Sequence, residues 1–270
     1  MKKAESGIGI FDSGIGGFSI LHEIIRKAPP VAINYISDDA YAPYGEKTDS
    51  EIIQRSRMIT EMLLISGSSV VVVACNSATA AAISTLRKEY PEVPFVGVEP
   101  YINVLNHRDQ FPGITKAAVI TTELTGHSEK FRRLKNRIDP DGLVQHVITP
   151  GLATIVEKIL DIGLNTNLRQ QLHSELEPLR KLELSHLILG CTHYPLIAGL
   201  IEQELGVKTV SPAPNVAERV VDVFPAEGEG HCSSFNYLST SSRNMEWEVK
   251  DTDYLDSLLR YSETGKDPQK

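Results

Sequence analysis

The sequence has few cysteines and no long apolar run. Three of its 270 residues are cysteine, an odd and low count that argues against a disulfide framework and favours a reducing cytoplasm. Its longest apolar stretches have the length of a strand, so we expect no membrane span and no membrane partner. The opening stretch MKKAESGIGIFDSG lacks an apolar segment of signal-peptide length, which predicts no targeting segment.

Motifs for cofactors and metals are also scarce. The glycines of GIGIFDSGIGGF do not fit the dinucleotide pattern Gly-x-Gly-x-x-Gly, because counting from Gly14 puts Ser19 in the last position. A zinc site made from Cys75, Cys191 and His193 is conceivable, but no Cys-x-x-Cys pair supports it. The chain has no Gly-x-Ser-x-Gly elbow of a serine hydrolase. We therefore expect neither a cofactor nor a bound metal.

Basic residues are outnumbered by acidic ones. The formal net charge is −8 and the pI is near 5.5, which argues against nucleic acid as the main partner. Hydrophobic residues make up 41% and charged residues 23% of the chain, as in an ordinary soluble globular protein. A chain of this length is more typical of two domains than of one.

Short strand patterns alternate with helical patterns along most of the chain. GIGIFD, AINYIS, SVVVVAC and PFVGV read as strands, and segments such as GGFSILHEIIRKA and ATAAAISTLRKEY between them have helical character. The rhythm breaks near Pro100 and restarts near Lys116. Repeated strand–helix units predict an α/β fold with two similar lobes, each a mostly parallel sheet flanked by helices. After Pro225 a Gly- and Ser-rich loop leads to what we expect to be an edge strand.

Two of the cysteines occupy matching places in this pattern. VVVVACNSATAAAI (70–83) and LSHLILGCTHYPLI (184–197) each run from an apolar strand through a small residue to Cys, a polar pair and a helical pattern. The carboxyl ends of parallel strands are where ligands collect, and a helix N-terminus lowers the pKa of a nearby thiol. A single such cysteine is most often just a buried small residue, but a matched pair favours chemistry. Cys232 has no such context and is expected to be structural.

Five segments, in order and at appropriate separations, resemble glutamate racemases of the aspartate/glutamate racemase family. They are GIFDSGIGGFSIL, YAPYGEKT, VVACNSATAAAI, GVEP and LILGCTHYPLI. The paired Cys-Asn-Ser and Cys-Thr-His motifs are specific to that family and its close relatives, and YAPYG narrows the resemblance to the glutamate branch. It implies a cofactor-independent enzyme that interconverts L- and D-glutamate, the D-isomer being a building block of bacterial peptidoglycan and hence of the cell wall.

The resemblance also implies an architecture. Family members have two pseudo-symmetric α/β lobes with the active site between them, and the second lobe is inserted in the first. We accordingly expect lobe one at residues 1–99 plus 211–270 and lobe two at 100–210. The partner implied is the small-molecule substrate glutamate. The sequence does not determine the oligomeric state, and a homodimer is one alternative.

The residues that match the family's site follow from the same resemblance. The implied catalytic residues are Cys75, Cys191, Asp12, His193 and Glu157. The implied substrate-binding residues are Asp12, Ser13, Tyr44, Gly45, Asn76, Ser77, Thr192 and His193. In the assignment usual for the family, Cys75 deprotonates D-glutamate and Cys191 deprotonates L-glutamate, with Asp12 and His193 as their respective helpers.

Two cysteines suit this reaction for a physical reason. Inversion of an α-carbon removes a proton from one face and delivers another to the opposite face, and a single base tends to return the proton where it came from. One thiolate acting as base while a second thiol acts as acid avoids that return.

The chain departs from the family at several positions. Ser77 stands where the family commonly has Thr, and both residues offer a hydroxyl. TPGLATIVE (149–157) lacks the family's Cys-Pro start and second proline, and SPAPNVAERV near Ser211 lacks the usual Asp. Two alternatives stay open: an aspartate racemase or related carbon-acid isomerase, and a ligand- or metal-binding relative without turnover.

Overall fold

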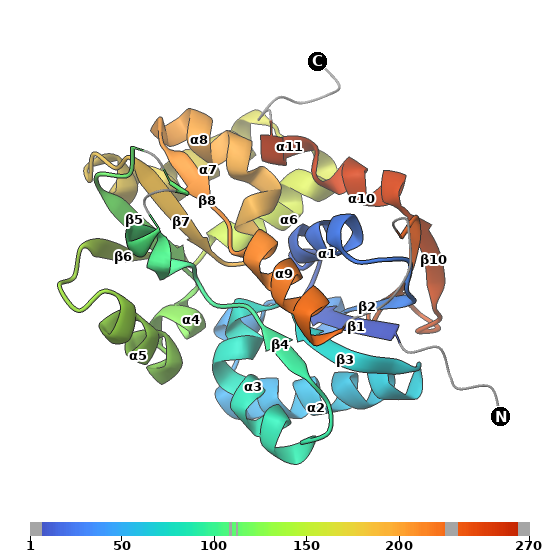
Figure 1. Ribbon diagram of the computed structural model, residues 1–270. Coiled ribbons are helices and arrows are strands. Elements are labelled where there is room, and N and C mark those ends of the chain that lie inside the picture. Colours follow the sequence, from blue (N-terminus) through green and yellow to red (C-terminus); the bar gives the residue numbers. More distant parts are fainter. Residues whose placement is uncertain (1–6, 108–109, 112, 225–231, 264–270) are drawn as a thin grey trace. The chain divides into compact units, whose positions relative to one another are not determined.

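The computed structural model describes residues 7–107, 110–111, 113–224 and 232–263. The chain forms two compact units (Figure 1). The first unit takes its residues from 1–98 and 213–257, and the second from 99–212 and 258–270. Within the described residues, no helix is both long and apolar enough to cross a membrane.

The first unit is built on a six-stranded sheet in the order β10-β9-β2-β1-β3-β4. Its neighbouring strands are parallel except for the antiparallel pair β9 and β10. The strands are β1 (Gly7–Asp12), β2 (Ile33–Ser37), β3 (Ser68–Val73), β4 (Phe95–Gly97), β9 (Ser234–Ser239) and β10 (Glu248–Asp251).

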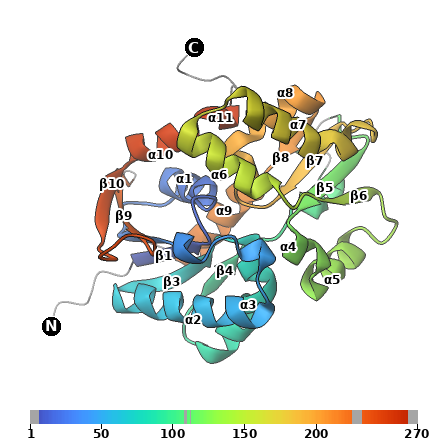
Figure 2. The same cartoon turned by 180° about the vertical axis from the view of Figure 1, so that it is seen from behind.

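Helices cover both faces of this sheet, with α2 and α3 on one side and α1 and α9 on the other (Figures 1 and 2). The helical elements are α1 (Phe18–Lys27), η1 (Asp39–Tyr41), η2 (Tyr44–Glu46), α2 (Asp49–Ile65), α3 (Asn76–Glu89), α9 (Ala213–Val223) and α10 (Thr252–Leu258). A capping box fixes the start of α2, because the side chains of Thr48 and Glu51 each bind the other's backbone N–H.

The second unit is built on a four-stranded, fully parallel sheet in the order β6-β5-β7-β8. Its strands are β5 (Ala117–Thr121), β6 (Val144–Ile148), β7 (His186–Gly190) and β8 (Lys208–Val210). Its helical elements are η3 (Ile102–Asn106), α4 (Glu123–His127), α5 (Glu129–Ile138), α6 (Leu152–Ile162), α7 (Thr166–Arg180), η4 (Tyr194–Ile197), α8 (Ala198–Leu205) and α11 (Arg260–Glu263).

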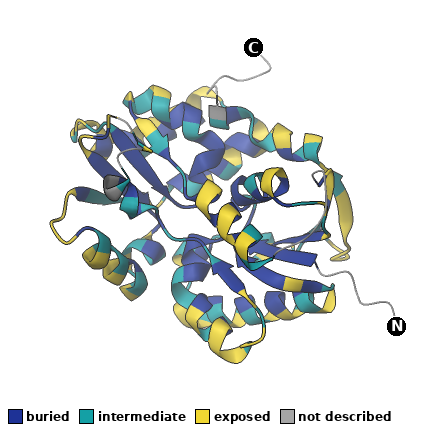
Figure 3. Cartoon of the chain, in the orientation of Figure 1, coloured by how far each residue is buried: buried dark blue, intermediate teal, exposed yellow. Residues whose placement is uncertain are grey.

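The central strands of both sheets are buried from end to end, as strands covered on two faces must be (Figure 3). The strand orders β2-β1-β3-β4 and β6-β5-β7-β8 are the same when each unit is counted from its own first strand. Cys75 follows the third strand of its unit, and Cys191 follows the third strand of the other. The two thiols are therefore topologically equivalent.

Two expectations from the sequence need correction. The strand after the Gly- and Ser-rich segment, β9, is not an edge strand, because β10 pairs with it on the outside. The end of the chain was assigned to lobe one, but α11 packs against η4 and α8 of the second unit. Of the predicted loop, residues 225–231 lie outside the described residues.

Gly190 is the last residue of β7 and directly precedes Cys191. Its close packing against β5 therefore helps to fix the position of the Cys191 thiol. A Cβ added at Gly190 would lie 2.5 Å from the backbone oxygen of Ile120 on β5, which neither strand can relieve by a rotamer change. We expect Gly190→Ala to lower the melting temperature by several degrees, because overpacking a core costs about 1–3 kcal/mol. Differential scanning calorimetry measures the shift.

Gly151→Ala in the same unit is the matched control. Gly151 has helical backbone angles (φ −87°, ψ −14°), and a Cβ there would meet only the end of the Glu175 side chain, at 3.0 Å. That carboxylate accepts the Gly151 amide at 2.9 Å, and its side chain can shift slightly without moving any backbone. This variant should melt close to wild type. Equal melting temperatures for the two variants would contradict the packing argument.

Candidate active site

Cys75 sits where the third strand of the first unit passes into a helix. The ladder continues one residue beyond β3, since Ala74 N donates to Phe11 O at 2.8 Å. Cys75 has extended backbone angles and is the N-cap of α3, and its carbonyl accepts the Thr79 amide at 2.8 Å. The side chain is buried. The positive end of the α3 dipole favours negative charge at this thiol.

Asp12 ends the neighbouring strand β1, Ser13 follows it, and both connect to this thiol. The Cys75 thiol donates to Ser13 Oγ over 3.8 Å, and Ser13 Oγ donates to Asp12 Oδ1 over 3.0 Å. Asp12 is fully buried and also accepts Gly14 N at 3.3 Å. It does not cap α1, whose N-cap is Gly17 with no side-chain cap bond. A thiol, a hydroxyl and a carboxylate therefore form a chain along which a proton can be held or moved.

Tyr35 holds the turn that carries Ser13. Its hydroxyl donates to Gly14 O at 2.9 Å, and a Cβ at Gly17 would lie 2.6 Å from that hydroxyl and 2.9 Å from the Cβ of Asp12. Burial, together with the charge of Asp12, raises the pKa of Tyr35 well above its usual value. Tyr35 is therefore a neutral donor, and the lack of a side chain at Gly17 lets it reach the loop.

Asn76 and Ser77 lie in the first turn of α3, and both are buried. Asn76 Nδ2 donates to Val98 O at 3.4 Å, while Asn76 Oδ1 is buried without a hydrogen-bond partner. An unsatisfied buried carbonyl costs free energy, so this oxygen is suited to accept a donor from a ligand.

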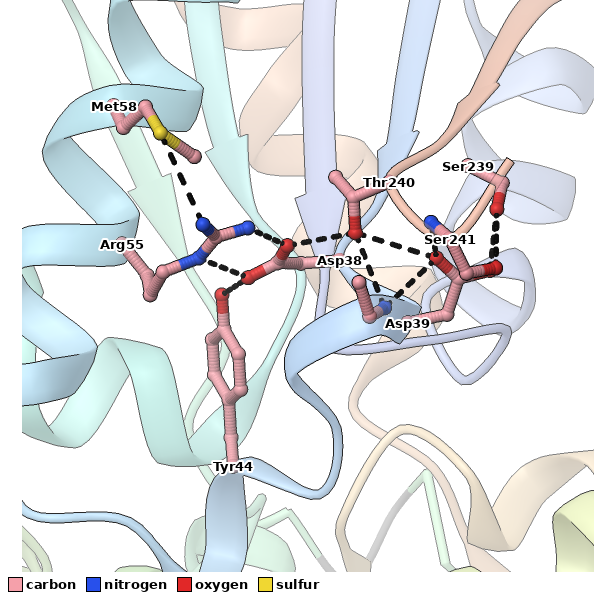
Figure 4. Close-up of polar contacts among 9 residues, drawn as sticks. Asp38, Asp39, Tyr44, Arg55, Met58, Ser239, Thr240 and Ser241 are labelled. Atoms are coloured by element: carbon pink, nitrogen blue, oxygen red, sulfur yellow. Dashed lines mark hydrogen bonds and ion pairs between the residues drawn. The ribbon is translucent and has the colours of Figure 1, made fainter. Parts of the chain in front are cut away.

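Tyr44 and Gly45 belong to η2, which contacts α3. The Tyr44 side chain is buried and its hydroxyl donates to Asp38 Oδ2 at 2.5 Å (Figure 4). The hydroxyl is thus engaged with Asp38, and the ring packs edge-on against Tyr41.

In the second unit, Cys191 is linked to an imidazole and a carboxylate. Cys191 Sγ lies 3.8 Å from His193 Nδ1, and His193 Nε2 lies 2.9 Å from Glu157 Oε1 on α6. His193 is buried, whereas the Glu157 side chain is 41% exposed. A carboxylate that fixes one ring nitrogen orients the other toward the thiol, which is how an activated nucleophile or base is built.

Tyr194 supports the turn after Cys191, in which Thr192 is also buried. The Tyr194 hydroxyl lies 2.8 Å from Thr149 Oγ1 and donates to Thr149 O at 3.2 Å. Burial, with the charge of Cys191, raises the pKa of Tyr194 well above its usual value. Thr149 directly follows β6, and its hydroxyl and carbonyl both contact the Tyr194 hydroxyl.

The structure thus groups the predicted residues into two half-sites, one in each unit. Asp12, Ser13 and Cys75 are linked in the first unit, and Cys191, His193 and Glu157 in the second. Among the residues that the structure describes, no group of three His, Cys, Asp or Glu is arranged to hold a metal ion.

The sequence alone did not indicate the residues that hold the two half-sites in place. Tyr35 and Asp38 bind Gly14 and Tyr44, two residues of the quoted motifs, yet each looks like an ordinary member of a strand or loop pattern. Tyr194 lies within the quoted motif LILGCTHYPLI, but its contact with Thr149 forms only on folding. For Asp38 a signal existed, since it follows strand β2 directly, just as the predicted Asp12 ends strand β1.

Comparison with known proteins gives a consistent answer. The model of the Asp/Glu/Hydantoin racemase family matches residues 13–220. The glutamate racemase of Pseudomonas putida strain W619 is 38% identical over 211 residues, covering 77% of this chain and 78% of that protein. The glutamate racemase of Pseudomonas aeruginosa is 37% identical over 246 residues, covering 89% and 91%.

Among solved structures, glutamate racemase isoform RacE1 from Bacillus anthracis superposes with a TM-score of 0.75 at 31% identity, covering 90% of this chain and 91% of that one. The family match includes every residue of the two half-sites except Asp12, which lies one residue before its start, and the relatives align over most of their own length. This chain belongs to the Asp/Glu/Hydantoin racemase family.

Proposed function

We propose that this protein is a glutamate racemase that works without a cofactor and uses Cys75 and Cys191 as its two acid–base groups. The observation that carries the proposal is the equivalent placement of two thiols, each after the third strand of its unit and each linked to further proton-accepting groups. The names of the relatives support glutamate as the substrate.

The difficulty of the reaction is the weak acidity of the α-proton. A thiol of ordinary pKa, about 8.5, is mostly protonated at neutral pH, so each cysteine needs a neighbour that takes or returns its proton. In our mechanism one cysteine, as thiolate, removes the α-proton while the other, as thiol, protonates the opposite face. The roles exchange for the other enantiomer.

The two half-sites have different helpers. His193, fixed by Glu157, is suited to poise Cys191, and Asp12, acting through Ser13, is suited to poise Cys75. The buried Asn76 Oδ1 is suited to accept a hydrogen bond from the substrate ammonium. The product D-glutamate would then supply peptidoglycan synthesis, as the resemblance to glutamate racemases implies.

The purified, dialysed protein should convert L-glutamate to D-glutamate with no added pyridoxal phosphate or metal. Circular dichroism of the amino acid follows the loss of its ellipticity, and L-aspartate serves as the alternative substrate. Turnover of aspartate but not glutamate would favour an aspartate racemase, and activity restored only by pyridoxal phosphate or metal would contradict cofactor independence. No turnover of either amino acid would favour a binding protein.

Replacement of either thiol should abolish racemisation but not all chemistry. Cys75→Ser and Cys191→Ser each remove one base, and every turnover needs both. Elimination of chloride from chloroglutamate needs only the first proton abstraction, so Cys191→Ser should keep elimination from the D-enantiomer and Cys75→Ser from the L-enantiomer. Chloride release measures this. Near wild-type racemisation by Cys75→Ser would refute the two-base mechanism.

Loss of a helper should slow one abstraction selectively. His193→Asn should reduce elimination from L-chloroglutamate by about a hundredfold, the usual scale for general acid–base assistance, and affect the D-enantiomer much less. Asp12→Asn should do the opposite. Elimination is informative because racemisation rates in the two directions are tied by an equilibrium constant of one. Equal slowing of both enantiomers in both variants would show that these residues act on binding or folding instead.

A further inference from the structure

Asp38 is the centre of a buried polar network in the first unit (Figure 4). It follows β2 directly, its side chain is fully buried, and its backbone N–H donates to Asp12 O at 2.9 Å. Each of the two carboxylate oxygens accepts two hydrogen bonds. Oδ2 accepts Tyr44 OH at 2.5 Å and Arg55 Nε at 2.9 Å, while Oδ1 accepts Thr240 Oγ1 at 2.9 Å and Arg55 Nη2.

Arg55 supplies the charge that balances this carboxylate. It reaches Asp38 from α2 with two parallel N–H groups, a geometry that only a guanidinium can provide. Its side chain is 24% exposed, and it also lies over the ring of Tyr41, 5.1 Å from the centroid. A fully buried carboxylate is costly without such a partner, so the paired contact with Arg55 offsets the burial of Asp38.

The network also ties a distant part of the chain to the segment 39–45. Thr240, just past β9, donates to Asp38, and Ser239 Oγ donates to the neighbouring Asp39 at 2.6 Å. The Ser241 amide donates to Asp39 Oδ1 at 2.9 Å. Arg55 of α2 holds Asp38 from one side, and residues 239–241 at the end of β9 hold Asp38 and Asp39 from the other.

Tyr44 connects this network to the half-site that contains Cys75. Its hydroxyl is held by Asp38, and its element η2 contacts α3, the helix that begins after Cys75. Burial, with the charge of Asp38, raises the pKa of Tyr44 well above its usual value, so the phenol remains a donor. Its position is therefore set by the carboxylate, and the position of the carboxylate is set by Arg55.

We infer that Asp38 and Arg55 are positioning residues for substrate binding, which hold Tyr44 and Gly45 in the place where they contact glutamate beside Cys75. The inference rests on the proposed function. Neither residue touches the reacting atoms: Arg55 acts through Asp38, and Asp38 acts through Tyr44.

The test is the kinetics of Arg55→Lys, which keeps the charge and loses the paired N–H geometry. We expect KM for both enantiomers of glutamate to rise roughly tenfold while kcat stays within about threefold, the pattern of an interaction lost equally from ground and transition states. A residue that only stabilised the fold would lower the melting temperature and leave KM of the folded enzyme unchanged.

Arg57→Lys is the matched control. Arg57 lies two residues further along α2 and makes the same two-pronged contact with a carboxylate, to Glu89 Oε2 at 2.7 Å and to Oε1 at 2.5 Å. That pair is exposed and lies at the other end of α3, away from Cys75. This variant should keep the wild-type KM.

A double-mutant cycle tests the route through Tyr44. Tyr44→Phe removes only the hydroxyl, and its combination with Arg55→Lys should raise KM by less than the product of the two single effects, because both act on one chain of contacts. Tyr44→Phe combined with Arg57→Lys should show independent effects. Should Arg55→Lys fail to fold, Thr240→Val, which removes one donor to Asp38, takes its place in the cycle.

The outcomes separate this inference from the proposed function. Absence of glutamate racemisation by the wild-type protein would overturn both. An active Arg55→Lys enzyme with unchanged KM, or multiplicative effects in the cycle with Tyr44→Phe, would overturn the inference alone.

Discussion

The mechanism that we propose for inverting a carbon centre depends on two groups that exchange protons independently, and each unit of this chain holds one buried thiol after its third strand. Because both sheets have the same strand order, the same local construction arises twice: a parallel strand is followed within two residues by Cys and then by a helical turn. The surrounding structure in each unit keeps that thiol buried and in contact with a group that can take its proton.

The two half-sites reach this end by different chemistry. Cys191 meets an imidazole fixed by a carboxylate, whereas Cys75 meets a hydroxyl that is fixed by a carboxylate. In both half-sites the hydroxyl of a buried tyrosine donates a hydrogen bond to a backbone carbonyl of a nearby loop. Tyr35 donates to the carbonyl of Gly14, and Tyr194 donates to the carbonyl of Thr149. The two units are therefore alike in having a buried tyrosine beside the thiol's turn, whereas the groups that exchange protons with the thiol differ between them.

Much of the fold could be predicted from the sequence, because apolar runs such as those before Cys75 and Cys191 are continuous, of strand length and local. β10 was missed since Glu248–Asp251 is short and exposed, and β9 was for that reason placed at the sheet edge. The matched settings of Cys75 and Cys191 are visible in the sequence pattern, and the resemblance indicates the other site residues. Arg55 and Thr240 are not indicated, because their role depends on a carboxylate that only folding brings to them.

Glutamate racemisation in deuterium oxide tests the two-base account most directly. Starting from L-glutamate, mass spectrometry of the separated enantiomers at early times should show deuterium in nearly all D-glutamate formed and almost none in the L-glutamate that remains. That pattern requires one group to remove the original proton and another to deliver a solvent deuteron. Product D-glutamate that retains the original protium, or equal deuterium in both enantiomers from the start, would contradict two separate thiols acting on opposite faces.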